Sequence, residues 1–214
     1  MSSPDQVAGT PQSKPKVLLC VTGSVAAVKA PRLAVLLREF AEVTLVKTSA
    51  SEHFLQRCEA YDPEGLAAFE ALSPPVPVLG DAEEWGSWER VGDPVLHVKL
   101  RDWADVMLVA PLSANTLAKL ANGLCDNLLT SVARAWDFAA RKPVVVAPAM
   151  NTHMWEHPLT AAHLEALRAL GGVSCVPPVA KTLACGDVGV GGLAELSDIS
   201  QAARAALVPG SSAP

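Results

Sequence analysis

Residues 16–40 read KVLLCVTGSVAAVKAPRLAVLLREF, and this stretch gives the clearest indication of the architecture. Residues 16–21 form a short apolar run that is typical of a buried strand. From Val25 to Phe40, apolar residues recur at helical spacing, although Pro31 weakens the expectation for the first turn. The stretch therefore predicts a strand that leads directly into a helix.

The same alternation continues along the chain. Further strands are expected at 43–46, 95–100, 105–110 and 143–147, and further helices at 114–120, 128–136, 159–170 and 198–207, the last with Ser197 as its N-cap. Residues 95–100 alternate between apolar and mixed positions, and His97 falls on the less apolar face. Apolar strands that alternate with helices predict an α/β fold with a parallel sheet covered on both faces. Residues 58–80 are expected to be an excursion from this core, because three prolines lie close together in them.

Composition and charge exclude several classes of protein. The chain has 214 residues, of which 50% are hydrophobic and 18% charged, so it can bury a core and suits one domain. Seventeen basic against 22 acidic residues give a net charge of −5, a poor match for nucleic acid or anionic lipid. We find no apolar run long enough to span a membrane and no signal peptide. We expect a cytoplasmic protein with its domain at 16–208, between a disordered N-terminal tail at 1–15 and a C-terminal tail at 209–214.

Two metal or disulfide interpretations are disfavoured. The cysteines are odd in number and form no C-x-x-C pair, which argues for reduced thiols; they are Cys20, Cys58, Cys125, Cys175 and Cys185. His153 to His157 matches H-x-x-E-H, but Pro158 follows at once and opposes the continuous helix that such a zinc site needs. We therefore expect no metal.

The loops after the strands are the places to look for a ligand, because parallel sheets bind ligands beyond the carboxyl ends of their strands. Gly23 and Ser24 follow the first strand and could cradle a phosphate, although an ordinary strand–helix turn explains them equally well. Thr48 and Ser49 follow the second strand. Small polar residues also follow the strand at 105–110, so small polar side chains are common to these three loops.

Two further segments are ambiguous from the residues alone. Asn151 lies near Met and Trp side chains that suit a planar ligand, but a structural loop explains them as well. The glycines between 186 and 192 predict a mobile flap with Cys185 at its edge; they nearly match a dinucleotide-binding motif, but no strong strand leads into it. Cys185 could be incidental, and His97 could be only a hydrogen-bonded histidine of the sheet.

Several motifs occur in order along residues 16–196: Gly23–Ala27, Gly92–His97, Arg101–Asp105, Ala110–Leu117, Gly123–Thr130, Pro148–Asn151 with Met154-Trp155, and Leu183–Asp187. On these segments the chain resembles the flavin-dependent cysteine decarboxylases, and most closely the branch that serves coenzyme A synthesis. The resemblance implies a single flavodoxin-like (Rossmann-type) domain that assembles as a homotrimer, with FMN between subunits. Cofactor contacts are then expected at Gly23, Ser24, Val25, Ala26, Thr48, Ser49, Ser113, Ala114, Asn115, Thr116 and Ala149.

The resemblance also implies an activity. It is the FMN-dependent decarboxylation of 4′-phosphopantothenoyl-L-cysteine to 4′-phosphopantetheine and carbon dioxide, through a thioaldehyde and an ene-thiol. His97 matches the catalytic histidine and Cys185 the cysteine that supplies the last proton. Asn151 matches the residue that holds the substrate carboxylate. Ala184 and Lys181 are expected to contact the substrate, Lys181 because Thr182 stands where the family often has a basic residue.

Two other functions remain open from the sequence. Some relatives bind and inhibit a protein phosphatase, but they usually carry long acidic extensions, whereas the tails here are short and weakly charged. Other relatives decarboxylate the C-terminal cysteine of a precursor peptide. Residues 183–187 resemble the coenzyme A branch more than that one.

Overall fold

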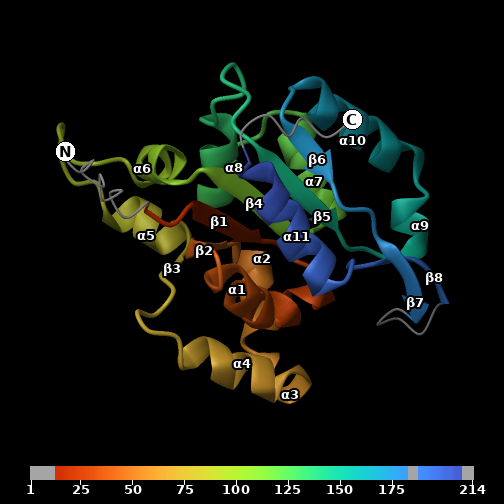
Figure 1. Ribbon diagram of the computed structural model, residues 1–214. Helices are drawn as coiled ribbons and strands as arrows, with labels where there is room; N and C mark the ends of the chain where they lie inside the picture. Colours follow the sequence, from red (N-terminus) through yellow and green to blue (C-terminus); the bar gives the residue numbers. More distant parts are fainter. Residues whose placement is uncertain (1–12, 183–187, 209–214) are drawn as a thin grey trace, which may run out of the picture.

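The computed structural model describes residues 13–182 and 188–208. Its centre is a six-stranded sheet in the order β3-β2-β1-β4-β5-β6, and every pairing in it is parallel (Figure 1). The strands are β1 (Lys16–Val21), β2 (Glu42–Lys47), β3 (Val78–Leu79), β4 (Val106–Leu112), β5 (Val144–Pro148) and β6 (Val173–Cys175). β7 (Val179–Thr182) and β8 (Val188–Gly192) form a second, antiparallel sheet. The predicted α/β fold is confirmed.

The strand order explains where a ligand would bind. β3 has only two residues, and without it the remaining strands follow the 2-1-3-4-5 order of flavodoxin-like sheets. The chain leaves β1 toward β2 on one side and returns to β4 on the other, so the topology reverses between β1 and β4. Such a reversal opens a crevice at the carboxyl ends of the strands.

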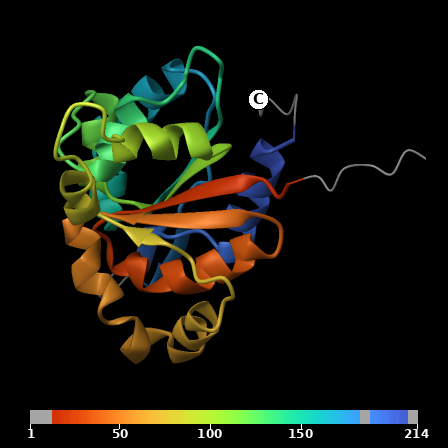
Figure 2. The same cartoon turned by 90° about the vertical axis from the view of Figure 1, so that its left-hand side faces the viewer.

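Helices cover both faces of the sheet (Figure 2). They are the 3-10 helix η1 (Val25–Lys29) and the α-helices α1 (Ala30–Arg38), α2 (Ser49–Leu55), α3 (Cys58–Tyr61), α4 (Pro63–Glu70), α5 (Asp81–Gly86), α6 (Leu96–Trp103), α7 (Ala114–Ala121), α8 (Leu128–Arg134), α9 (Thr152–Trp155), α10 (Pro158–Ala169) and α11 (Leu196–Ala206). The predicted helix at 25–40 divides into η1 and α1, and Pro31 lies in the first turn of α1, where its missing N–H costs no helical hydrogen bond. None of the described helices is long and apolar enough to cross a membrane.

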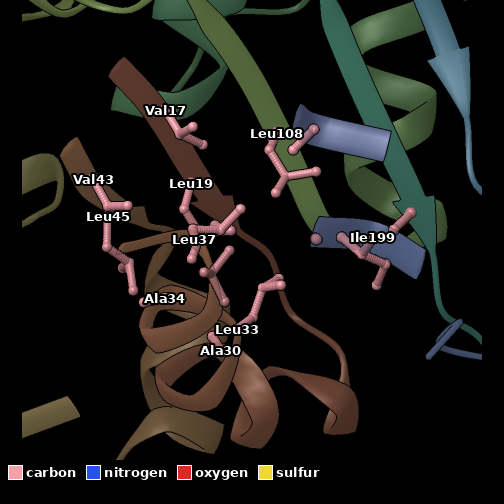
Figure 3. Close-up of a cluster of buried hydrophobic side chains, with 14 of the residues drawn as sticks. Val17, Leu19, Ala30, Leu33, Ala34, Leu37, Val43, Leu45, Leu108 and Ile199 are labelled. Carbon is pink, nitrogen blue, oxygen red and sulfur yellow. The ribbon is translucent and has the colours of Figure 1, made fainter. Parts of the chain in front are cut away.

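The apolar runs of the strands are explained by a core on each face of the sheet. Val17 and Leu19 of β1 pack with Leu33 of α1 and Ile199 of α11 (Figure 3). Leu18, between them in the sequence, points to the opposite face and joins the core formed with α8 and α10. Successive side chains alternate across a strand, so a strand buried on both faces must be apolar throughout.

A strand was expected at 95–100, but Leu96–Trp103 form the helix α6, with Val95 as its N-cap. Leu96 and Leu100 are four residues apart, a spacing that fits both an alternating strand and a helix. Trp103 continues the helical series, and all three side chains pack into the core on the α8 face of the sheet. The tertiary contact with α8 therefore selects the helix, and His97 lies in its first turn.

Three other local expectations need correction. Residues 58–80 are only partly an excursion, because Val76 is buried and β3 pairs with β2. The last helix begins at Leu196, and its N-cap is Glu195 instead of the expected Ser197. Gly189 and the glycines that follow lie in β8, where a strand had not been expected.

An ion pair joins the 58–80 segment to the core. Both oxygens of Asp62 accept hydrogen bonds from the guanidinium of Arg32 on α1, at 2.8 and 2.5 Å, and Asp62 also caps α4 by accepting from Gly65 N at 3.0 Å. The hydrogen bond from Arg32 holds the pKa of Asp62 below its ordinary value. The carboxylate is therefore stabilised in the folded state.

We expect Asp62→Asn to lower the free energy of unfolding by about 0.5–1 kcal/mol at neutral pH, the range of a partly exposed ion pair. A lowered folded pKa stabilises the protein above the unfolded pKa, so the difference should shrink as the pH falls below about 3.8. Urea unfolding at neutral and acidic pH measures this. Glu64→Gln removes an exposed carboxylate 3.6 Å from the same Arg32 and serves as the control. Equal losses in the two variants would contradict a specific role for Asp62.

Candidate functional site

The loops after β1 and β4 are joined by one buried hydroxyl. Thr22 is fully buried, and its Oγ1 donates to the carbonyl of Pro111 at 2.7 Å and accepts from Ser113 N at 2.8 Å. These two bonds span the position where the topology reverses. They hold the start of η1 and the start of α7 at the same edge of the sheet.

Three helices begin at this edge, each capped by a residue that the sequence had singled out. Ser24 caps η1 by accepting from Ala26 N at 3.4 Å, Thr48 caps α2 by accepting from Ser51 N at 3.2 Å, and Ser113 caps α7 by accepting from Thr116 N at 3.3 Å. Helix N-termini carry N–H groups without intrahelical partners and a partial positive charge. Together they make this edge suitable for an anionic group.

The loop after β1 also comes close to α2. A methyl group at Gly23 would lie 2.7 Å from Cβ of Ala50, so only glycine fits this approach. Val25, Ser49 and Asn115 are exposed beside the three caps, of which Thr48 and Ser113 are buried, and they form a solvent-facing rim. The structure thus brings together the predicted cofactor residues that follow β1, β2 and β4, namely Gly23, Ser24, Val25, Ala26, Thr48, Ser49, Ser113, Ala114, Asn115 and Thr116.

The loop after β5 joins the same edge. Ala149 N donates to the carbonyl of Leu112 at the end of β4, at 3.0 Å, and Met150 N donates to the carbonyl of Gly191 in β8, at 2.9 Å. Asn151 caps α9, because its Oδ1 accepts from His153 N at 2.8 Å. Ala149 and Asn151 are therefore held between the sheet and the β7–β8 hairpin.

The hairpin approaches Asn151 closely. Gly191 has a φ of 153°, and a methyl group there would lie 2.3 Å from the Met150 carbonyl oxygen. The strands β7 and β8 lead into and out of residues 183–187, which contain Ala184 and Cys185; both lie outside the described residues. Lys181 on β7 pairs with Glu195 at 3.3 Å.

The helix that carries His97 lies apart from the loop after β5 and from the β7–β8 hairpin. α6 lies on the opposite side of the chain from α9 and the hairpin (Figure 1). There, Nδ1 of His97 lies 2.5 Å from Oε1 of Glu84 in α5, and the backbone N of His97 donates to Oε2 of the same carboxylate at 3.1 Å. Neither the contact of Glu84 with His97 nor the bridge made by Thr22 could be expected from the sequence, since each residue contacts a partner that is distant in the sequence.

The histidines at 153 and 157 and the described cysteines do not form a second site in the part of the chain that the structure describes. His153 follows the start of α9, whereas His157 caps α10, so the two histidines do not share a continuous helix. Among residues 13–182 and 188–208, no group of three or more potential metal ligands is present. Burial raises the pKa of the thiols of Cys20, Cys58 and Cys175, which makes these three cysteines poor nucleophiles.

We expect Thr22→Val to destabilise the fold by about 1–3 kcal/mol, because the shape is kept while buried Ser113 N loses its acceptor. Chemical denaturation measures the loss. Thr22→Ser keeps the hydroxyl and is the matched control, with a smaller expected effect. Wild-type stability in Thr22→Val would show that the bridge between the two loops is not needed.

Comparison with known proteins gives consistent matches. The model of the Flavoprotein family matches residues 6–207. A phosphopantothenoylcysteine decarboxylase from Oryza sativa subsp. japonica is 51% identical over 194 residues, which cover 91% of this chain and 81% of the relative. A solved structure of a cysteine-to-serine variant of PPC decarboxylase, complexed with pantothenoylaminoethenethiol, has a TM-score of 0.78 and 49% identity and covers 89% of this chain and 97% of that chain.

A second solved structure, the FMN binding protein AtHal3, has a TM-score of 0.76 and 50% identity, and the match covers 89% of this chain and 95% of that one. These matches confirm the resemblance predicted from the motifs. They extend over nearly all of the strands and helices described above. The chain therefore belongs to the Flavoprotein family.

Proposed function

We propose that this chain is an FMN-dependent decarboxylase that converts 4′-phosphopantothenoyl-L-cysteine to 4′-phosphopantetheine and carbon dioxide in coenzyme A biosynthesis. The observation that carries the proposal is the match, at 49% identity, to a PPC decarboxylase variant complexed with pantothenoylaminoethenethiol. That ligand is an ene-thiol, the species expected once carbon dioxide has left an oxidised cysteinyl group.

The edge formed by the four loops fits FMN. Three capped helix starts supply N–H groups for a phosphate, and Gly23 permits the loop after β1 to approach α2 closely. The hydroxyl of Thr152, the residue after Asn151, is buried without a hydrogen-bond partner among the described residues. A ligand can still supply the missing hydrogen bond to this hydroxyl. The residues that would hold the cofactor follow β1, β2, β4 and β5.

When bound, FMN supplies a two-electron acceptor for the substrate and returns the electrons at the end. His97 would take the proton of the substrate thiol as the carbon that bears the sulfur loses a hydride, its hydrogen together with both electrons of the C–H bond, which gives a C=S group. Loss of carbon dioxide from the neighbouring carbon then sends the bonding electrons toward sulfur. Asn151 would hold the carboxylate before it leaves, with its side-chain NH2 as donor. Cys185 would donate the proton that completes the reduced product.

We also propose that the protein works as a cytoplasmic homotrimer with a site shared between subunits, without nucleic-acid or membrane partners. α6, which carries His97, and α9, which Asn151 caps, lie on opposite sides of the chain (Figure 1), so a second copy would supply one of the two residues to a site that contains both. Large apolar side chains are exposed just before His97, with Trp85 77% and Val91 93% exposed. An association between copies would cover this surface.

The expected activity is release of carbon dioxide and formation of 4′-phosphopantetheine by the FMN-loaded protein. Cys185→Ser should still release carbon dioxide but stop at the ene-thiol, because the last proton donor is missing. Mass spectrometry of the products measures both. A peptide with a C-terminal cysteine, offered in parallel, is not expected to react. Full product formation by Cys185→Ser would remove that residue from the last step, and turnover of the peptide alone would replace the substrate.

Subunit mixing tests the shared site. His97→Asn and Asn151→Asp should each be inactive, but co-expression should restore about a quarter of wild-type activity. In a randomly mixed ring, about a quarter of the sites combine an intact His97 from one subunit with an intact Asn151 from its neighbour. Native mass spectrometry verifies that mixed oligomers form. Mixed oligomers without activity would contradict a site between subunits.

A further inference from the structure

Glu84 holds His97 by two hydrogen bonds that use both oxygens of its carboxylate. Oε1 lies 2.5 Å from Nδ1 of the imidazole, and Oε2 accepts from the backbone N of the same residue at 3.1 Å. The Glu84 side chain is 11% exposed and the His97 side chain 28% exposed. A mostly buried carboxylate with two N–H donors is fixed in place, because losing either bond would leave an oxygen desolvated and unpaired.

The bond to the backbone explains why the carboxylate has one orientation. His97 lies in the first turn of α6, where backbone N–H groups have no partner within the helix. Val95, the N-cap of α6, makes no side-chain capping bond. Glu84 therefore caps α6 from a neighbouring helix, and the cap places Oε1 against the imidazole.

The neighbouring acids of α5 have different partners. Glu83 accepts from Gly80 N at 2.6 Å and so closes the start of its own helix. Asp81 accepts from Leu128 N at 2.8 Å at the start of α8. Of these three acids, Glu84 is the one that contacts a histidine in the described structure, and Glu83 offers a matched control with the same charge on the same helix.

We propose that Glu84 is a positioning residue for the reaction: it holds His97 in the tautomer with the proton on Nδ1 and the lone pair on Nε2. This inference rests on the proposed role of His97. A carboxylate can only accept, so Nδ1 must donate to it and Nε2 is left to take a proton. When the S–H bond of the substrate breaks and the Nε2–H bond forms, the positive charge of the imidazolium lies beside the carboxylate. This arrangement follows the general logic of an acid that orients a catalytic histidine.

Glu84→Gln keeps the shape of the side chain but changes the hydrogen bond that it makes with His97. The backbone N of His97 can only donate, so the carbonyl oxygen of the glutamine would face it and the NH2 group would face Nδ1. Nδ1 would then have to accept, and the proton would move to Nε2. The variant should keep FMN content and oligomeric state, while kcat falls about 10- to 100-fold with little change in KM. Glu83→Gln should behave as the wild type.

The tautomer is read directly by nitrogen-15 NMR of histidine-labelled protein, loaded with FMN, at about pH 8.5, well above the ordinary histidine pKa. A His97→Asn spectrum assigns the resonances. We expect a protonated Nδ1 in the wild type and a protonated Nε2 in Glu84→Gln. Unchanged kcat in Glu84→Gln, or an equal loss in Glu83→Gln, would overturn the proposal.

The wild-type spectrum tests the proposal even if the variant fails to assemble. An unprotonated Nδ1 of His97 in the wild type would also overturn the proposal. The NMR readout does not depend on activity. If the wild type failed to decarboxylate 4′-phosphopantothenoyl-L-cysteine but showed the expected tautomer, the proposed substrate would be wrong while the positioning of His97 by Glu84 would stand.

Discussion

The hydroxyl of Thr22 joins the two halves of the sheet at the point where the chain changes direction. It donates to Pro111 and accepts from Ser113, so the loop after β1 cannot move independently of the loop after β4. The starts of η1 and α7 are fixed as a consequence, and the loop after β5 is attached through the bond from Ala149 to the end of β4. One buried bridge thus gives the candidate cofactor site its shape.

The sequence contained most of this arrangement because the strands involved are buried on both faces. Apart from Lys16 at the start of β1, the strands β1, β4 and β5 are apolar, and a parallel sheet places their carboxyl ends at one edge. Ser24 and Ser113 could therefore be expected near one another from the chain alone. The function of these loops could not be derived in the same way, since small polar residues at a helix start also serve as ordinary caps. The motif resemblance supplied that step.

The elements that were mispredicted depend on tertiary contacts. Leu96 and Leu100 fit a strand as well as a helix, and packing against α8 decides between them. β8 was unexpected because glycine has low strand propensity, but Gly191 lies where the backbone of the next loop leaves no room for a side chain. Glu84 precedes His97 by thirteen residues and carries no local signal, so the fold alone reveals the pair.

We propose that the loops after β1, β2, β4 and β5 hold FMN through its isoalloxazine ring and its phosphate. The absorption spectrum of the purified protein, with mass analysis of the released cofactor, tests it most directly. We predict a yellow protein that releases FMN and, once stripped, rebinds FMN far more tightly than riboflavin, because riboflavin lacks the phosphate. A colourless oligomer that cannot be reconstituted with FMN would show that these loops do not hold FMN.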